Sequence, residues 1–329
     1  MRLLVPAAVA LLASCTSEPT AVRPLARDVP ASAVVLPASA YRAKLPFSGV
    51  HSSLLDVNDQ GVMVGFVDQD AIWYQLNGAR YVLNNAGGTA AEARAVNSSG
   101  EAAGNVYNRA VHLLQPAIWT TPTSAPLLRP EWGWVWDMND QATAVGIFLH
   151  NGINTAFVWE SRSGSFTALP FPSGARWTQA YGINNDMVIV GSSDVGGVMW
   201  RQQASGWVAT ILRRINPWAI DAGYGTVGQD RATSQPAWGK PNLAGWFGVY
   251  GVANGINPDG TVSGEVSGVP GGLPQPFVAD RSGTITMLPL PPGYMQGIAY
   301  NSARCGLVVG AVFNQAIFAY EGVYWDPGC

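Results

Sequence analysis

A short phrase of residues recurs seven times along the chain: a small residue, an apolar residue, Asn, a few turn residues, and an apolar strand that closes on Gly. Successive copies begin 39, 42, 45, 37, 36 and 44 residues apart. A period of about 40 residues that contains only β-type segments is typical of a propeller blade. The sequence therefore predicts an all-β fold, a seven-bladed β-propeller. The Asn position of the phrase falls at Asn58, Asn97, Asn139, Asn184, Asp221, Asn257 and Asn301.

Four short strands fit inside each copy, and the fourth copy is the clearest. Its apolar segments lie at residues 166–169, 178–183, 188–190 and 197–200, with tight turns between them. Asn and Gly dominate the turns because both tolerate the positive φ that tight hairpins require. We therefore expect four-stranded blades, with tryptophans wedged between neighbouring sheets. These tryptophans are Trp73, Trp119, Trp159 and Trp200.

The composition supports this architecture and excludes one class of function. Charged residues are 12 % of the chain, about half the usual share. Gly (38), Pro (23) and Trp (13) are plentiful, which suits many short strands joined by tight turns. The net charge is −3, whereas proteins that bind nucleic acids normally carry a basic surface. We expect no nucleic-acid partner.

The N-terminus carries a targeting segment. A basic start is followed by an apolar run at residues 3–12, too short to span a bilayer but typical of a secretory signal peptide. The run ends in Leu-Ala-Ser-Cys at Cys15, which resembles a bacterial lipoprotein signal. That resemblance implies a signal peptide at residues 1–14 and a lipid on Cys15 that anchors the protein to a membrane. The alternative is an ordinary signal peptide with Cys15 incidental; residues 15–40 are expected to form a flexible tether.

The two chain ends are predicted to share one blade. Interior copies end in an outer strand that finishes in Leu-Pro, but only four residues follow Trp325. The missing phrase, Ala-Lys-Leu-Pro, stands at residues 43–46. We expect residues 41–45 to complete the last blade and so remove an exposed sheet edge. The propeller then covers residues 41–329.

Two cysteines other than Cys15 are placed for a disulfide. Cys305 lies in the first turn of the seventh copy, and Cys329 follows that copy's third strand. First and third strands run in the same direction, so both positions fall on one face of the ring. A disulfide in an oxidising exterior would close a loop of about 24 residues and contribute roughly 3 kcal/mol. The alternative is two unpaired thiols.

The repeat resembles the HAF-type extracellular repeat found in tandem in secreted bacterial proteins. The matching stretches are residues 156–159, 180–191, 255–264 and 299–310, and the likeness extends over residues 41–325. The name-giving His-Ala-Phe is absent, because Asp70, Pro116, Thr155 or Gln315 occupies the His position. The resemblance implies the fold and an extracytoplasmic location, and supplies no catalytic residues. Thr16 after the lipidated Cys15 leads us to expect the outer membrane or cell surface.

No motif in the sequence points to a cofactor, a metal or a catalytic centre. The three histidines, His51, His112 and His150, are far apart and lack metal-ligand spacing. The Gly-x-Gly-x-x-Gly run at residues 223–228 falls on the repeat's own turn and strand, and no helix follows it to bind a pyrophosphate. We therefore expect no cofactor and no metal.

A set of residues seven positions before the Asn forms a candidate binding rim. The starts of the innermost strands share one face of the ring, where aromatic side chains offer flat platforms to sugars, peptides or partner proteins. Hairpin loops at residues 105–115, 147–154 and 265–275 are expected to surround this rim. The alternative is that the aromatics pack between blades. The candidate rim residues are His51, Trp132, Trp177, Arg214, Tyr250 and Tyr294.

Three functions follow from these features. The first is a monomeric binding module, anchored at the surface, that recognises a glycan or a protein on one face. The second is a repeat scaffold without a small ligand. The third is a propeller lyase or hydrolase, for which His51, Arg214 and Asp230 are the only candidates, and propellers host all three classes.

Overall fold

A computed structural model describes residues 36–109, 112–213, 215–221, 225–232, 234–239, 250–267, 272–280 and 284–329. These described residues form one compact unit, and the statements below concern them alone. The predicted signal peptide, Cys15 and most of the predicted tether lie outside these residues. Within the described residues, no helix is long and apolar enough to span a membrane.

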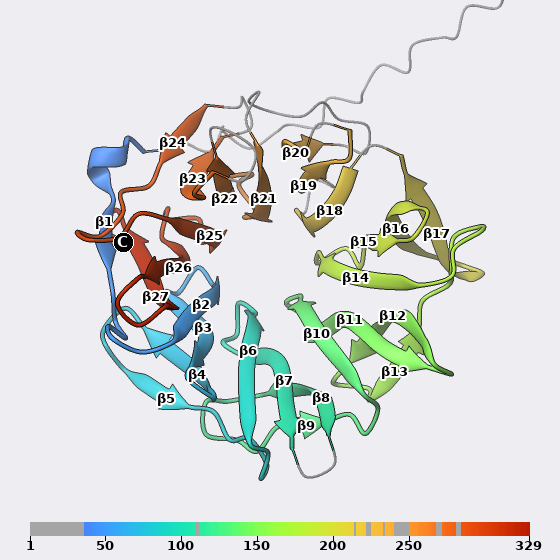
Figure 1. Cartoon of the computed structure of the whole chain (residues 1–329). Helices are drawn as coiled ribbons and strands as arrows, with labels where there is room; N and C mark the ends of the chain where they lie inside the picture. The colour runs from blue at the N-terminus through green and yellow to red at the C-terminus, as the bar shows by residue number, and fades with distance from the viewer. Residues whose placement is uncertain are drawn as a thin grey trace, which may run out of the picture. The chain divides into compact units, whose positions relative to one another are not determined.

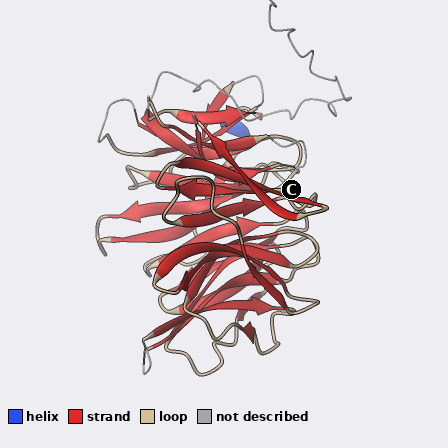
Figure 2. Ribbon diagram, turned by 90° about the vertical axis from the view of Figure 1, so that its right-hand side faces the viewer, coloured by secondary structure: helices blue, strands red, loops and turns tan. Residues whose placement is uncertain are grey.

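Seven antiparallel sheets follow one another around a ring, which confirms the seven-bladed β-propeller (Figure 1). Six sheets have four strands, and the fifth has three among the described residues. Figure 2 shows strands almost throughout, with loops at the two faces of the ring. The first residues form a short 3-10 helix, Ala38–Ala40.

Each blade begins with its innermost strand and continues outward. The innermost strands are β2 (Ser52–Val57), β6 (Ala90–Val96), β10 (Gly133–Met138), β14 (Thr178–Ile183), β18 (Ile215–Ile220), β21 (Tyr250–Ile256) and β25 (Gly297–Ser302). The second strands are β3 (Val62–Val67), β7 (Ala102–Asn108), β11 (Thr143–His150), β15 (Ile189–Ser193), β19 (Thr226–Asp230), β22 (Val262–Ser267) and β26 (Val308–Asn314). The third strands are β4 (Asp70–Gln75), β8 (Leu113–Trp119), β12 (Ile153–Glu160), β16 (Gly196–Gln203), β20 (Pro236–Gly239), β23 (Gln275–Ala279) and β27 (Ala319–Asp326). The outer strands are β5 (Arg80–Val82), β9 (Leu127–Leu128), β13 (Ser165–Ala168), β17 (Gly206–Leu212), β24 (Ile285–Met287) and β1 (Arg42–Lys44).

The predicted wedges between blades are confirmed. Trp73, Trp119, Trp159 and Trp200 are buried on third strands, and Trp73 and Trp119 share one hydrophobic cluster with residues of blades 1 and 2. The indole N–H of Trp200 donates to the carbonyl of Pro170, which follows the outer strand of the preceding blade, at 2.8 Å. A buried indole needs such an acceptor, and the indoles of Trp73 and Trp119 likewise donate to the carbonyls of Gly100 and Asn84.

The chain ends close the seventh blade as predicted. Strand β1 pairs with β27 in the register Arg42 to Asp326, and Lys44 forms an ion pair with Asp326 at 2.9 Å. Cys305 and Cys329 are disulfide-bonded, with their Cα atoms 5.9 Å apart.

In four copies the Asn joins its blade to the next, whereas Nδ2 of Asn97 donates to Glu101 in its own turn. The Oδ1 atom of Asn58 accepts hydrogen bonds from the backbone N–H groups of Gln60 and Val62, which fixes the turn between the first two strands. Its Nδ2 atom donates to the carbonyl of Asn97 in the next blade at 2.9 Å. Asn184 repeats this link with the carbonyl of Asp221 at 3.0 Å. The repeat Asn thus links neighbouring blades of the ring.

The seventh copy has a register that differs from the predicted one. In blade 1 the turn begins at Asn58, whose backbone N–H donates to the carbonyl of Val62. In blade 7 the equivalent turn begins at Ala303, whose backbone N–H donates to the carbonyl of Leu307. Nδ2 of Asn257 accordingly donates to the carbonyl of Ala303. The Asn position assigned to Asn301 was therefore wrong by two residues, because Ala303 makes the turn with backbone hydrogen bonds alone.

Two of the loops expected at the rim are largely strands. Residues 105–108 and 113–115 end the β7–β8 pair, and residues 147–150 and 153–154 end the β11–β12 pair; the pairs remain in register from Ala102 to Asn108 and from Thr143 to His150. The apolar and β-branched residues near these tips continue the sheet. The third expected loop, at residues 265–275, lies partly outside the described residues.

Candidate functional site

Every innermost strand contains a β-bulge at the same place in its pairing with the second strand. In blade 3 the register shifts between Val135 and Asp137, and Trp136 is the extra residue. A bulge breaks the inward–outward alternation and re-aims one side chain, which here points into the central channel. The seven extra residues all line one cavity. They are Leu55, Arg94, Trp136, Tyr181, Trp218, Asn254 and Tyr300.

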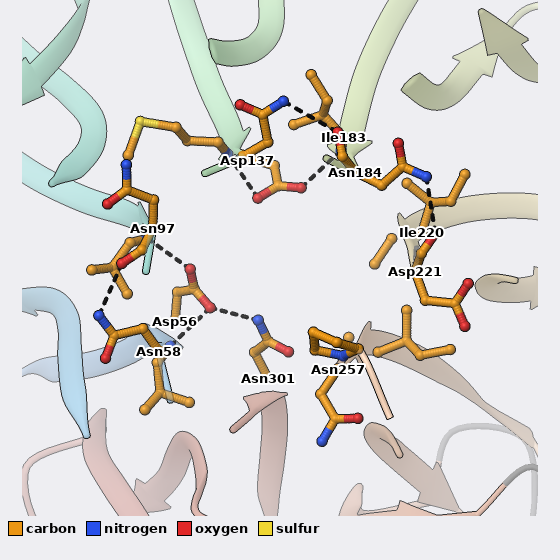
Figure 3. A pocket seen from close by; sticks show the side chains of 18 of the residues that line it. Asp56, Asn58, Asn97, Asp137, Ile183, Asn184, Ile220, Asp221, Asn257 and Asn301 are labelled. Carbon is orange, nitrogen blue, oxygen red and sulfur yellow. Dashed lines mark hydrogen bonds between the residues drawn. The ribbon is translucent and has the colours of Figure 1, made fainter. Parts of the chain in front are cut away.

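This cavity is the mouth of the central channel on the face where the innermost strands end. Its volume is about 410 Å3, which lies in the range of small-molecule pockets. The Asn turns surround the opening, and the bulge residues form its wall. Figure 3 shows the opening with the carboxylates of Asp56 and Asp137 directed toward its centre.

Aromatic rings form a continuous arc along one side of the channel. Trp136 contacts Tyr181 edge-on with ring centroids 5.5 Å apart, and Tyr181 contacts Trp218 at 4.6 Å. Trp218 is 37 % exposed, although large aromatic residues are normally buried. The guanidinium of Arg94 lies over Trp136, 4.2 Å from the ring centroid, and extends the arc into blade 2.

Two aspartates stand directly after bulge residues and bind neighbouring blades together. Asp56 accepts hydrogen bonds from the N–H of Val57 and, at 2.7 Å, from the N–H of Val96 in the next blade. Asp137 likewise accepts hydrogen bonds from the backbone N–H of Met138 and from that of Ile183 in the next blade. These bonds orient both carboxylates, so the acidic groups of the channel are held in place before any ligand arrives.

Both aspartates ionise at unusually high pH. Burial raises the pKa of Asp56 to about 6, although hydrogen bonds from Val96, Asn301 and Val57 act in the opposite direction. Burial, followed by the negative charge of Asp56, raises the pKa of Asp137 to about 7. The two carboxylates therefore influence each other across the channel mouth and change charge near neutral pH.

A second set of polar contacts ties the turns around the opening. Asp140 accepts from the N–H of Ser98 in blade 2 and from Nδ2 of Asn185 in blade 4. The backbone N–H of Arg304 donates to the carboxylate of Asp59, and the Arg304 guanidinium forms an ion pair with the same carboxylate at 3.4 Å. These contacts make the rim of the channel mouth polar and fixed in shape.

The aromatic rim predicted from the sequence lies on the opposite face, where the innermost strands begin. His51 is exposed just before β2, and Trp132 just before β10 is 37 % exposed. Tyr250, the first residue of β21, is 40 % exposed. Trp177 lines a shallow hollow of about 310 Å3 together with Arg176, Gln179 and residues 152–154. These aromatics are thus available to solvent and are not the wedges between blades.

The predicted rim residue of blade 7, Tyr294, does not occupy the rim position of the other copies. Tyr294 lies two positions before the true equivalent of Trp132, because the seventh copy was misaligned. Its hydroxyl donates to the carboxylate of Glu321, and burial with the Glu321 contact raises the pKa of Tyr294 to about 12. Arg214 lies outside the described residues.

The two described candidates for catalysis lie on different blades, His51 before β2 in blade 1 and Asp230 at the end of β19 in blade 5. His51 is on the face opposite the channel mouth, and the buried carboxylate of Asp230 accepts a hydrogen bond from the N–H of Ala232 in its own turn. In the part of the chain that the structure describes, no group of three or more His, Cys, Asp or Glu side chains is placed to hold a metal ion.

The channel wall is the feature that the sequence analysis missed. Its residues occupy the position three before the repeat Asn, and the composition there was a signal. That position is large, polar or aromatic in every copy, whereas the residue before it is small or apolar. An alternating strand would place this residue against the next blade, and only the bulge turns it toward the channel.

Comparison with known proteins supports the fold. No family model matches the chain, and no curated protein matches its sequence. The solved structure of YCF48 bound to a D1 peptide matches 89 % of this chain and 97 % of its own, at 11 % identity and a TM-score of 0.53. The WD40 repeats of RRP9 match 88 % of this chain and 98 % of their own, at 12 % identity and a TM-score of 0.55. The propeller domain of the Trilobed protease from Pyrococcus furiosus matches 84 % and 96 %, at 12 % identity and a TM-score of 0.54. The chain belongs to the class of β-propellers.

Proposed function

We propose that this chain is an extracytoplasmic binding module, built from HAF-like propeller repeats, that holds a segment of a protein partner at the mouth of its central channel. The observation that carries the proposal is the bulge in every innermost strand. The contacts between blades at the turns and at the buried tryptophans hold the ring together without Trp136, Tyr181 and Trp218 pointing into the channel. Exposed aromatics surrounded by oriented polar groups are the usual composition of a recognition site.

The dimensions favour a chain segment over a large flat surface. A cavity of about 410 Å3 receives one or two side chains, and the polar turns around it offer hydrogen-bonding groups to a backbone. A propeller of the same fold, YCF48, has been solved with a bound D1 peptide. That precedent supports the ability of such a ring to receive a peptide, and the identity of the partner rests on this chain's own residues.

The proposed location rests on the N-terminal sequence and on the disulfide. Residues 1–14 followed by Cys15 favour a lipid anchor, and the Cys305–Cys329 disulfide suits an oxidising compartment. A lipid on Cys15 would restrict the propeller to the neighbourhood of a membrane and raise its effective concentration toward a partner there.

A second candidate function is glycan recognition on the opposite face. The hollow beside Trp177 combines an indole with the side chains of Arg176 and Gln179, a combination suited to a sugar ring and its hydroxyl groups. The hollow is shallow, and Arg176 is already paired with Asp194 at 2.8 Å. The channel mouth has more enclosed surface, so it is the first candidate.

The test is a positional-scanning peptide library presented to the full chain and to three variants, with thermal unfolding measured for each. Trp218→Leu alters the channel, and Trp132→Leu and Trp177→Leu alter the opposite face. The proposal predicts peptide binding that Trp218→Leu abolishes and the other two variants retain. Loss only in Trp132→Leu or Trp177→Leu would move the site to the opposite face. No binding by the wild-type chain would contradict the proposal and favour a scaffold.

A further inference from the structure

The mouth of the channel has an excess of negative charge. Five aspartates line the cavity, against two arginines. Both arginines already have carboxylate partners: Arg94 pairs with Glu92 at 3.2 Å, and Arg304 pairs with Asp59 at 3.4 Å. Asp56 and Asp137 are oriented instead by hydrogen bonds from backbone N–H groups of neighbouring blades. Backbone dipoles offset only part of a carboxylate's charge, so the channel attracts cations.

Titration behaviour agrees with this charge distribution. The charge of Asp56 contributes to the raised pKa of Asp137, which shows that the two groups repel each other. On blade 6, burial raises the pKa of Glu265; burial, followed by the negative charge of Glu265, raises the pKa of Tyr300 to about 12. Each of these shifts is in the direction that a nearby cation would reverse.

The aromatic arc already holds one cation in the required geometry. The guanidinium of Arg94 lies over Trp136, 4.2 Å from its centroid, and it is 5.7 Å from the centroid of Trp134. The other end of the arc, formed by Tyr181 and the partly exposed Trp218, extends over blades 4 and 5. A cation that reached these rings from the mouth would be desolvated on one side by aromatic faces, where such contacts are strongest.

We infer that the channel receives a single basic side chain, the ammonium of a lysine or the guanidinium of an arginine, from the partner segment. This inference rests on the proposed function and specifies the chemistry of its ligand. The Tyr181–Trp218 end of the arc contacts the alkyl stem and the cationic head, while Asp137 and Asp56 supply the opposite charge. The carboxylates stand apart on separate blades, which suits an extended organic cation better than a compact metal ion.

The test compares four capped pentapeptides that differ only in the central residue: Ac-GGKGG-NH2, Ac-GGRGG-NH2, Ac-GGQGG-NH2 and Ac-GGEGG-NH2. Binding to the full chain is measured by saturation-transfer NMR at 20 mM and 300 mM NaCl. The inference predicts binding of the Lys and Arg peptides in the millimolar range, weakened severalfold by the higher salt because screening reduces the attraction. The Gln and Glu peptides bind at least fivefold more weakly.

Matched variants identify the side chains that hold the cation. Tyr181→Leu is compared with Tyr81→Leu, since Tyr81 is an exposed tyrosine on the outer strand β5. Asp137→Asn is compared with Asp194→Asn, which removes the same charge on the opposite face. We expect roughly fivefold weaker binding for the two channel variants and no change for the two controls.

The outcomes separate this inference from the proposed function. Tighter binding of the Gln or Glu peptide, sensitive to Tyr181→Leu, would leave a channel binding module in place and overturn the choice of a cation. Lys and Arg binding that Tyr81→Leu and Tyr181→Leu leave equally intact would also overturn it, because the charge would then act from elsewhere. Absence of binding by all four peptides at 10 mM overturns the inference, and the library experiment then decides the proposed function alone.

Discussion

The carboxylate of Asp56 on β2 accepts a hydrogen bond of 2.7 Å from the backbone N–H of Val96 on β6, and so joins the first blade to the second at the wall of the channel. On its other side, Nδ2 of Asn301 on β25 donates to the same carboxylate, which joins the seventh blade to the first. One acidic side chain therefore lies at the closure of the ring and at the candidate binding site. Function and stability are coupled at this point.

Stability should depend on pH through these buried carboxylates. Folding raises the pKa of Asp56 to about 6 and of Asp137 to about 7, above the ordinary value of 3.8. A raised pKa means that the folded state binds protons more tightly, so the stabilisation is complete below pH 4 and is lost as the pH rises through 6 to 7. We expect the free energy of unfolding to fall by on the order of 5 kcal/mol between pH 4.5 and 7.5, measured by urea denaturation.

The Asp137→Asn variant tests the origin of this dependence. An amide cannot ionise, so the fall in stability between pH 4.5 and 7.5 should be about half that of the wild type. Asp194→Asn is the control, because the pKa of Asp194 is lowered by Arg176 and its titration lies below this pH range. An unchanged pH slope in Asp137→Asn would contradict the assignment.

The Asn links between blades should contribute substantially to stability. Asn184→Ala removes the acceptor for two backbone N–H groups and the donor to the carbonyl of Asp221, all of them buried or partly buried. Unsatisfied groups of this kind cost about 1–3 kcal/mol, and we expect a loss near 3 kcal/mol. Asn77→Ala removes an exposed turn bond to Ala79 and should cost less than about 1 kcal/mol. Equal losses in the two variants would show that the ring does not depend on these links.

The two kinds of tryptophan should respond differently to truncation. Trp200 is fully buried between blades and hydrogen-bonded to Pro170, so Trp200→Ala should cost more than about 3 kcal/mol. Trp132 is 37 % exposed on the rim, and Trp132→Ala should cost about 1 kcal/mol or less. Thermal unfolding of both variants checks this, and a large loss in Trp132→Ala would mean that the rim aromatics are structural.

The disulfide should stabilise the closed ring by roughly 3 kcal/mol, as expected for a closed loop of this length. The Cys329→Ser variant should unfold at a lower denaturant concentration than the oxidised wild type and at the same concentration as the wild type in reductant. A difference between the variant and the reduced wild type would reveal a role for Cys329 beyond the crosslink. Strand β1, which also pairs with β27, should keep the ring closed in both cases.

The sequence predicted the ring, its closure and its disulfide because these depend on long-range periodicity. The spacing of the Asn turns and the missing outer strand after Trp325 are both visible without coordinates. The register of blade 7 could not be predicted in the same way, because Ala303 makes its turn without the side chain that marks the other copies. Almost any residue can make backbone hydrogen bonds, so the sequence pattern does not reveal a turn that depends on them alone.

The candidate site was harder to predict for a different reason. Strand alternation places Trp136 and Trp218 against a neighbouring blade, and a bulge of one residue turns them into the channel. Sequence alone does not reveal where a strand gains an extra residue. The predicted rim residues Trp132 and Trp177 do lie on one face and in solvent, but the acidic aromatic channel on the other face was not anticipated.

The most direct test of the channel as the site for a basic side chain is 19F NMR of the full chain labelled with 5-fluorotryptophan, titrated with Ac-GGKGG-NH2. Resonances are assigned by single Trp→Phe variants, so that the channel and rim tryptophans report separately within one molecule. If the channel holds the basic side chain, saturable shifts are expected for Trp218 and Trp136 and none for Trp132 or Trp177. Shifts confined to Trp132 and Trp177, or none at all, would contradict the channel as the binding site.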